Sequence, residues 1–120
     1  MKSKRNNMLG IDIEENTRFL GWDDKKLNRI FTKKEIEYAK NKPNPEKHFC
    51  GFFCVKEALV KALDNKQIEY KKIEVLHTDT LKPYINETAY VKSLIGKAEH
   101  MLTISISHTD THSTAVVQIV

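Results

Sequence analysis

The chain has 120 residues, of which 40% are hydrophobic and 30% charged, with only three prolines. This composition predicts one soluble globular domain over residues 1–120 and excludes a disordered chain. A formal net charge of +4 and a pI near 9.0 favour an acidic or phosphorylated partner. No apolar run is long enough to span a bilayer or to act as a signal peptide, so we expect a cytoplasmic protein in which residues 1–7 form a flexible polar tail.

Residues 8–13 predict the first strand, because apolar and polar or small side chains alternate there. The period is that of a half-buried strand, with Leu9, Ile11 and Ile13 on one side. Asp12 faces away from that apolar side. Asp12 is then either a residue that turns the strand into a loop or a functional carboxylate.

A helix is expected next, capped by Asn16 or Thr17 and running to about Arg29. Apolar residues recur within it at helical spacing. Its outer side carries a basic stripe, which is either a solvated surface or a docking surface for an acidic partner. The stripe consists of Arg18, Lys25, Lys26 and Arg29.

Thr32 and Glu35 form a capping box for a short helix, and Asn44-Pro45 begins a long one that ends near Leu63. Between residues 49 and 63 the long helix is apolar nearly all round. Its only charges are Lys56, Glu57 and Lys61, and each needs a partner if it is buried. Glu57 and Lys61, four residues apart, form either a surface ion pair or part of a functional site.

Two cysteines, Cys50 and Cys54, lie one turn apart on the long helix. That geometry is awkward for a disulfide, and the chain has no further cysteine for a zinc site. We expect reduced, packed thiols.

The C-terminal half predicts strands at 72–76 and 82–85, and a helix at 87–95 that Asn86 caps and Gly96 ends. Residues 101–108 alternate cleanly, and 114–120 supply a second apolar run to pair with them as a hairpin. The expected fold class is α+β, with a mainly antiparallel sheet and helices packed around the long buried central helix.

We expect a functional site formed by Asp12, Glu57 and His108. Asp12 ends the first predicted strand, Glu57 lies on the buried helix, and His108 ends the strand at 101–108. Two carboxylates with no cysteine or histidine nearby are the oxygen ligands that Mg²⁺ prefers, with water and phosphate completing its shell. Lys61 can contact the same phosphate, and His108 can add a hydrogen bond or a proton. Glycine-rich phosphate loops, nucleophile elbows and metal-ligand histidine spacings are not found in the sequence.

Four motifs in order resemble a known family. They are Gly10-Ile11-Asp12 followed by Arg18, the sequence F-x-x-K-E-A-x-x-K-A-L at 53–63, Lys82-Pro83, and Ser105-Ile106-Ser107-His108. Together they are similar to the holo-acyl-carrier-protein synthases, the short single-domain class of 4′-phosphopantetheinyl transferases. The likeness covers nearly the whole chain, from residue 8 to residue 120.

The resemblance implies transfer of the phosphopantetheine arm of coenzyme A to a serine of an apo acyl carrier protein, releasing adenosine 3′,5′-bisphosphate. It implies Asp12 and Glu57 as magnesium ligands, with Glu57, Lys61 and His108 as catalytic residues. It also implies docking of the acidic carrier protein on the basic stripe, and homotrimers with active sites between subunits. The base that accepts the serine proton stays open: a metal-bound water or Glu57 comes first and Lys61 second.

The sequence departs from the family at the coenzyme A site. Phe52 stands where relatives usually carry an arginine that contacts phosphate, and Leu81 replaces a common glycine before Lys82 and Pro83. The turn at 64–67 also lacks the usual glycines. The resemblance implies Lys56, Lys61, Lys82, Pro83 and His108 as residues that bind coenzyme A, and we expect Lys56, Lys47 or Lys82 to supply the missing positive charge.

Two other functions remain open at this point. One is a catalytically inactive relative that binds carrier protein or coenzyme A without transfer, which Phe52 makes plausible. The other is a small basic nucleic-acid-binding domain, disfavoured because basic and aromatic residues are not interleaved. The preferred assignment is the transferase, with neither nucleic acid nor a membrane as partner.

Overall fold

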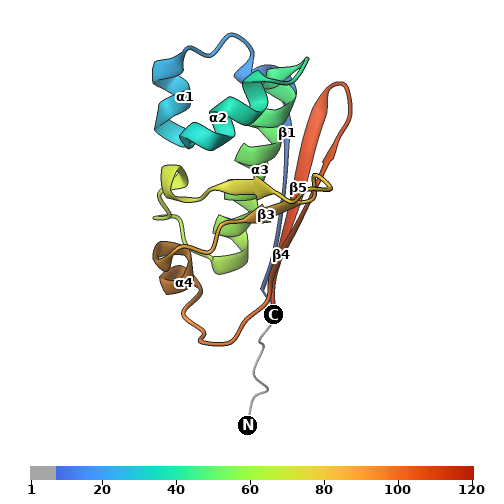
Figure 1. The fold of residues 1–120 in the computed structure, drawn as a ribbon. Helices are drawn as coiled ribbons and strands as arrows, with labels where there is room; N and C mark the ends of the chain where they lie inside the picture. Colours follow the sequence, from blue (N-terminus) through green and yellow to red (C-terminus); the bar gives the residue numbers. More distant parts are fainter. Residues whose placement is uncertain (1–7) are drawn as a thin grey trace.

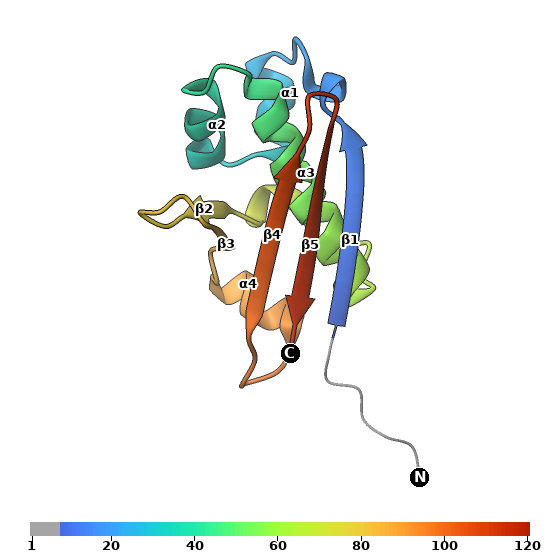
Figure 2. The same cartoon turned by 90° about the vertical axis from the view of Figure 1, so that its right-hand side faces the viewer.

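The computed structural model describes residues 8–120 as an α+β fold in which helix α3 (Pro45–Leu63) lies against one face of a three-stranded sheet (Figure 1). The sheet is antiparallel, in the order β1 (Met8–Glu15), β5 (His112–Ile119), β4 (Leu102–His108). Figure 2 shows the three strands side by side with α3 behind them. The expected tail, residues 1–7, lies outside the described part of the chain.

Helix α3 is the middle layer of the fold. The sheet covers one side of it, and α1, α2 and α4 cover the other (Figure 1). Eleven of its nineteen residues are buried, including Phe49, Val55 and Leu59. Pro45 occupies its first turn, and Asp64 ends it in the left-handed conformation at φ 49°. The expected α+β class with a long buried central helix is confirmed.

Strand β1 turns its aliphatic side outward, which reverses the usual orientation of a half-buried strand. Leu9, Ile11 and Ile13 are between 62% and 66% exposed. The reason lies at Gly10, where an added Cβ would come within 1.9 Å of the Ala58 carbonyl oxygen of α3. The strand therefore contacts the helix backbone to backbone on its Gly10 side, and the aliphatic row is left on the outer face of the sheet.

The single helix expected from residue 16 to 29 is wrong. The structure has a 3₁₀ turn, η1 (Asn16–Phe19), and then helix α1 (Asp24–Ile30). Gly21, at φ +74°, separates them, and Asp23 caps α1 by accepting a hydrogen bond from the Lys26 amide at 2.9 Å. Asn16 caps nothing, because its side chain is buried and donates to the Thr109 carbonyl at 3.1 Å.

The capping box is confirmed at α2 (Lys33–Lys40), where Thr32 and Glu35 bond each other's backbone amides. Downstream, a 3₁₀ turn η2 (Tyr70–Lys72) precedes a two-stranded sheet of β2 (Val75–His77) and β3 (Pro83–Ile85). The strand predicted at 72–76 therefore begins later than expected.

Helix α4 (Ala89–Ile95) is capped by Thr88, not by Asn86, and ends at Gly96 as expected. The Asn86 amide instead donates to the Glu74 carbonyl at 2.9 Å, which ties β3 to the segment before β2. Within residues 8–120, no helix combines the length and the apolar character needed to cross a membrane.

Candidate active site

The two predicted carboxylates come from different elements, Asp12 from β1 and Glu57 from α3. Because Gly10 brings β1 against α3, Asp12 lies on the side of the strand that faces the helix. The hydroxyl of Tyr70, in η2, donates a hydrogen bond to Oε2 of Glu57. Burial, Glu57 and also Asp12 raise the pKa of Tyr70, so both carboxylates act on this one hydroxyl.

The donor set of this site suits a magnesium ion. Within residues 8–120, no protein group other than the Tyr70 hydroxyl is hydrogen-bonded to the Glu57 carboxylate, and Tyr70 takes only Oε2. The described residues contain no group of three or more histidines, cysteines or acidic residues able to hold a metal. Two carboxylates that leave the other positions to water and phosphate are the arrangement that Mg²⁺ prefers.

Lys61 contacts Asp12 and not Glu57, so the surface ion pair considered for Glu57 and Lys61 is not formed. The Lys61 ammonium lies 3.2 Å from Asp12 Oδ1 and donates to the Ile11 carbonyl at 3.0 Å. Its side chain is 55% exposed, and such exposed pairs contribute little to stability. The ammonium is therefore able to turn to a phosphate bound beside Asp12.

The Cys54 thiol, on α3, lies near the Asp12 carboxylate. It donates to the Ser113 carbonyl at 3.4 Å, while Cys50 donates to the Glu14 carbonyl at 3.5 Å. Neither cysteine is in a disulfide, as expected. Contact with Cys50, burial and the nearby Asp12 raise the pKa of the Cys54 thiol, so it remains protonated.

His108, at the end of β4, has its tautomer set by its neighbours. Its Nδ1 lies 2.6 Å from Ser113 Oγ, and that hydroxyl donates its proton to Asn16 Oδ1 at 2.6 Å. Ser113 must therefore accept from His108, which places the proton on Nδ1 and leaves Nε2 without one. Burial and the nearby Lys47 lower the pKa of His108, which favours this neutral form.

His108 also lines a pocket of about 220 Å³ between α3, β4 and the β2–β3 hairpin. Tyr38 and His77 stack in it with ring centroids 3.9 Å apart. Burial, the nearby His108 and neighbouring lysines lower the pKa of His48 to about 4. Phe52 and Pro83 also line the pocket. Two residues of the predicted coenzyme A site, Pro83 and His108, therefore lie in one pocket. Phe52, which stands where relatives usually carry an arginine, lies in the same pocket.

Gly51 explains why His108 can sit so close to α3. A Cβ at this position would come within 2.8 Å of His108 Cε1 and 3.1 Å of Ile106 Cγ2. Only glycine leaves room for the imidazole against the helix, and the ring is thereby held at the mouth of the pocket.

The expectation that Lys56 contacts coenzyme A is wrong. Its side chain is fully buried, and its ammonium donates to Glu35 Oε1 at 2.7 Å, the Ile30 carbonyl at 2.8 Å and the Tyr70 carbonyl at 2.9 Å. All three ammonium protons are therefore used inside the chain. Phe52 carries no charge at the position where the family resemblance implies an arginine. Another residue would therefore have to supply that positive charge.

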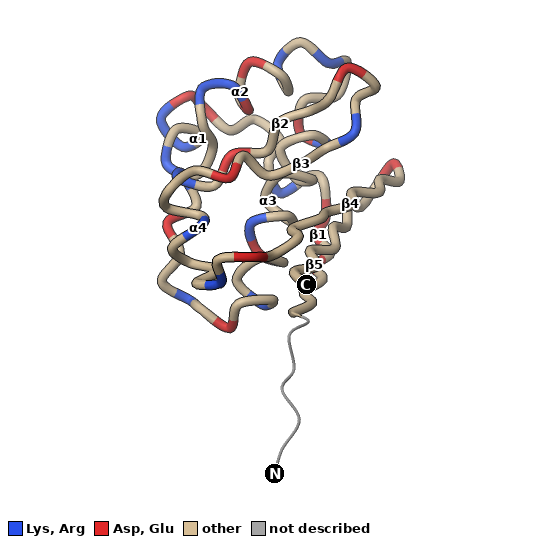
Figure 3. Tube along the Cα trace, turned by 60° about the horizontal axis from the view of Figure 1, so that its bottom comes forward, with Lys and Arg blue, Asp and Glu red and all other residues tan. Residues whose placement is uncertain are grey.

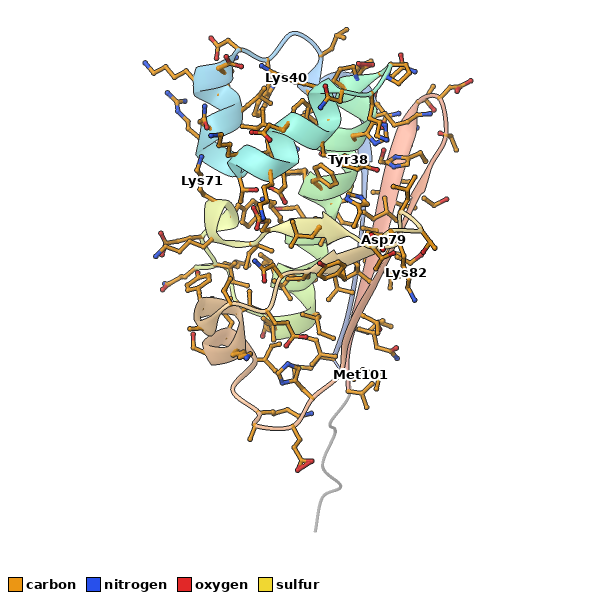
Figure 4. All side chains as sticks on the ribbon, viewed as in Figure 1. Tyr38, Lys40, Lys71, Asp79, Lys82 and Met101 are labelled. Atoms are coloured by element: carbon orange, nitrogen blue, oxygen red, sulfur yellow. The ribbon has the colours of Figure 1, made fainter. Side chains whose placement is uncertain are left out.

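Lys47 and Lys82 are the remaining candidates for that charge. Lys47 lies close enough to His48 and His108 to lower the pKa of both imidazoles. Lys82 is exposed on the β2–β3 hairpin, beside Asp79 in Figure 4, and lines a second pocket with Leu102 and Ile104 of β4.

The four residues of the basic stripe do not share one helix. Lys25, Lys26 and Arg29 are exposed on α1, where Figure 3 shows basic positions along the helix. Arg18 belongs to η1, pairs with Glu14 at 2.5 Å, and lies 4.5 Å from the ring centroid of Phe53. Arg18 also acts on the pKa of Tyr70, so it lies close to the carboxylate site.

Tyr70 is a candidate site residue that sequence patterns alone do not indicate. It lies in a short polar segment with no periodicity, and only the folded chain brings it to Glu57. The sequence offered one weak signal, an aromatic residue among charged ones between a long helix and a strand.

Comparisons with known proteins agree with the motif analysis. The model of the 4′-phosphopantetheinyl transferase superfamily matches residues 8–117. A holo-[acyl-carrier-protein] synthase of Protochlamydia amoebophila is 36% identical over 114 residues, covering 89% of this chain and 92% of that protein. One of Caldanaerobacter subterraneus is 33% identical over 114 residues and covers 90% of both.

Solved structures of holo-(acyl-carrier-protein) synthases are also similar to this chain. A holo-(acyl-carrier-protein) synthase from Bacillus anthracis, in complex with CoA (3′,5′-ADP), has a TM-score of 0.76 at 31% identity, covering 93% of this chain and 94% of that one. The Helicobacter pylori enzyme, in complex with coenzyme A, has a TM-score of 0.80 at 28% identity, covering 94% and 100%. The chain therefore belongs to the 4′-phosphopantetheinyl transferase superfamily, among the holo-[acyl-carrier-protein] synthases.

Proposed function

We propose that this chain transfers the 4′-phosphopantetheine group of coenzyme A to a serine of an apo acyl carrier protein, in a magnesium-dependent reaction that releases adenosine 3′,5′-bisphosphate. The observation that carries the proposal is the contact of Lys61 with Asp12 at 3.2 Å, which places the Asp12 carboxylate beside the α3 residue one turn from Glu57. Relatives and solved neighbours named for this activity support it.

The reaction forms a bond between the serine oxygen and the phosphorus next to pantetheine, and it breaks the bond from that phosphorus to the bridging oxygen of the diphosphate. The leaving bisphosphate takes the electron pair. A bound Mg²⁺ supplies neutralisation of the charge on the diphosphate oxygens. Asp12 and Glu57 would hold it, and Lys61 turns from Asp12 to the phosphoryl oxygens.

The serine proton goes to Glu57 in this scheme. Tyr70 occupies Oε2, so the proton would be taken on Oε1, which no described protein group occupies, through the lone pair of that oxygen that does not face the ion. Lys61 is the weaker candidate, because an ammonium next to phosphates stays protonated.

Coenzyme A is assigned to the pocket around His108 and Pro83, with its phosphates toward Lys47 and Lys82. The pocket has stacked rings for an apolar or heteroaromatic group, and Lys47 and Lys82 directly precede its lining residues His48 and Pro83 in the chain. Two solved neighbours were obtained with coenzyme A or its 3′,5′-ADP part, which supports a site of this kind.

The acidic carrier protein docks on the basic residues of η1 and α1, which border the carboxylate site at Arg18. The outer sheet face is assigned to self-association into homotrimers with active sites at the interfaces. Its exposed row of Leu9, Ile11 and Ile13 supports this, because exposed aliphatic rows of this kind mark interaction surfaces. The unpaired buried thiols fit a reducing compartment such as the cytoplasm.

The direct test is transfer itself. Wild-type protein, apo carrier protein, coenzyme A and Mg²⁺ are incubated, and the carrier mass is followed by intact mass spectrometry. Asp12→Asn and Glu57→Gln are expected to slow transfer by about 100-fold or more, because charge stabilisation of several kcal/mol is lost. Asp64→Asn, at the exposed end of α3, is the matched control and should keep wild-type rates.

Three results would contradict the proposal. Coenzyme A binding without any transfer would identify an inactive relative. Equal transfer with and without a chelator would remove the metal from the mechanism. Steeply salt-dependent RNA binding with no coenzyme A binding would favour the nucleic-acid alternative.

A further inference from the structure

Two adjacent residues of α3 hold Tyr70 at its two ends. The Lys56 ammonium donates to the main-chain carbonyl of Tyr70 at 2.9 Å, and the Tyr70 hydroxyl donates to Oε2 of Glu57. Tyr70 is thus bonded to the buried Lys56 through its main chain and to the carboxylate of Glu57 through its side chain.

The Lys56 end is fixed by its surroundings. Glu35 accepts from Lys56 at 2.7 Å, and the same carboxylate accepts the Thr32 amide at 2.9 Å and the Val75 amide at 2.8 Å. Both side chains of the ion pair are fully buried. The network joins α2, α3, η2 and β2, so the backbone at Tyr70 cannot move relative to α3 without breaking its hydrogen bond to the buried Lys56 ammonium.

The Glu57 end is fixed by the ring. Tyr70 packs edge-on against Phe53, with ring centroids 6.0 Å apart and an interplanar angle of 65°. A ring held in this way presents its hydroxyl in one direction. Because a carboxylate on a three-bond side chain otherwise rotates freely about its terminal torsion, a fixed donor on Oε2 selects one orientation.

We infer that Tyr70 is a positioning residue for Glu57, which it orients by binding Oε2 so that Oε1 is left for the divalent cation and the attacking hydroxyl. This inference rests on the proposed function. Lys56 and Glu35 serve as the anchor that keeps Tyr70 in place, and this gives the buried ion pair a role in the site, although neither residue contacts substrate. Hydrogen-bond partners of metal ligands have this effect in many metalloproteins.

The test is the affinity of the full-length protein for Mn²⁺, measured from free and bound ion by electron paramagnetic resonance, without coenzyme A or carrier. Tyr70→Phe keeps the ring and removes the hydroxyl. We expect its dissociation constant for Mn²⁺ to rise about tenfold. In the transfer assay the half-saturating Mg²⁺ concentration should rise likewise, while the KM for coenzyme A is unchanged.

Tyr90→Phe is the matched control. The Tyr90 hydroxyl accepts a hydrogen bond from the Glu69 amide at 2.8 Å, so this variant also removes a tyrosine hydroxyl from the η2 region but leaves Glu57 untouched. Its Mn²⁺ affinity should match wild type. Thermal unfolding of both variants shows whether either has lost folded structure.

The outcomes separate this inference from the proposed function. Asp12→Asn must weaken Mn²⁺ binding if the metal site exists. If it does so while Tyr70→Phe binds like wild type, or loses no more than Tyr90→Phe, the positioning role is refuted and the proposed function stands. If wild type binds no Mn²⁺, or Asp12→Asn changes nothing, the metal site fails, and the inference fails with it.

Discussion

At the scale of single residues, His108 shows how neighbouring groups set the chemistry of a side chain. Ser113 and Asn16 fix its proton on Nδ1, and burial with Lys47 lowers its pKa, so Nε2 is left as an acceptor on a ring that lines the pocket. An acceptor repels phosphate oxygens. His108 can contact a coenzyme A phosphate only after Nε2 takes up a proton.

This gives a pH prediction with a definite sign. The free protein holds His108 neutral, whereas a bound phosphate favours the imidazolium, so binding takes up a proton. Coenzyme A affinity should therefore fall as pH rises above the lowered pKa of His108, by about three- to tenfold between pH 6 and 8. Titration calorimetry in two buffers of different ionisation enthalpy measures the affinity and the proton uptake.

His108→Gln serves as the control, because the same pocket then lacks this titrating group. The difference in pH slope between wild type and the variant isolates His108 from the phosphates and from His48 and His77. Identical slopes would contradict the assigned tautomer or the phosphate contact.

Single residues show what sequence reasoning can and cannot predict. The motifs predicted Asp12, Glu57 and Lys61 as site residues, and the structure brings Lys61 to Asp12 and Tyr70 to Glu57. Lys56 was expected at coenzyme A because Phe52 leaves a positive charge missing from that site. Its partner is Glu35, 21 positions away, and only tertiary structure reveals that contact.

At the scale of elements, the contact between β1 and α3 determines where Asp12 lies. Gly10 permits backbone contact with Ala58, and Asp12 follows on the same side of the strand. Alternation in the sequence correctly predicted a strand here. It could not determine which side is buried, because a glycine that admits a helix backbone looks the same as a glycine on a solvated face.

Gly10→Ala tests this contact. The added Cβ would meet the Ala58 carbonyl oxygen at 1.9 Å and the Ala62 amide nitrogen at 2.7 Å, and both are backbone atoms that cannot rotate away. We expect the free energy of unfolding to fall by about 3 kcal/mol in urea titrations. Gly21→Ala, at φ +74° with open space around it, should cost only about 1 kcal/mol. Equal losses would show that β1 and α3 do not touch closely.

The prediction of a single helix from residue 16 to 29 was wrong because a turn interrupts the segment. Leu20 and Leu27 fit a helical period, but Gly21 and the Asp23 cap divide the segment into η1 and α1. Leu20 is 65% exposed, whereas Phe19 is buried against Phe53. Local turn chemistry outweighed a short periodic pattern.

At the scale of the whole molecule, the sheet has one face on α3 and an outer face that carries an aliphatic row. Leu9, Ile11 and Ile13 form that row on the edge strand β1. Exposed aliphatic rows favour association between subunits. Burial of this row in the proposed trimer would explain why β1 turns its aliphatic side away from α3.

Ile11→Glu, in the middle of the row, should convert an oligomer to a folded monomer by placing a charge in the interface. Multi-angle light scattering after size exclusion measures the mass, and circular dichroism checks the fold. Leu20→Glu changes an equally exposed aliphatic residue away from the sheet and should keep the wild-type mass. A monomeric wild type, or an unchanged Ile11→Glu oligomer, would contradict the assignment of this face.

The proposed transferase depends on Asp12 and Glu57 holding one divalent cation together with the diphosphate of coenzyme A. Anomalous diffraction from crystals soaked with Mn²⁺ and coenzyme A locates the ion directly. We expect a single peak within coordination distance of both carboxylates and of a diphosphate oxygen. A peak that touches only one of the two carboxylates, or none at the site while coenzyme A is bound, would contradict it.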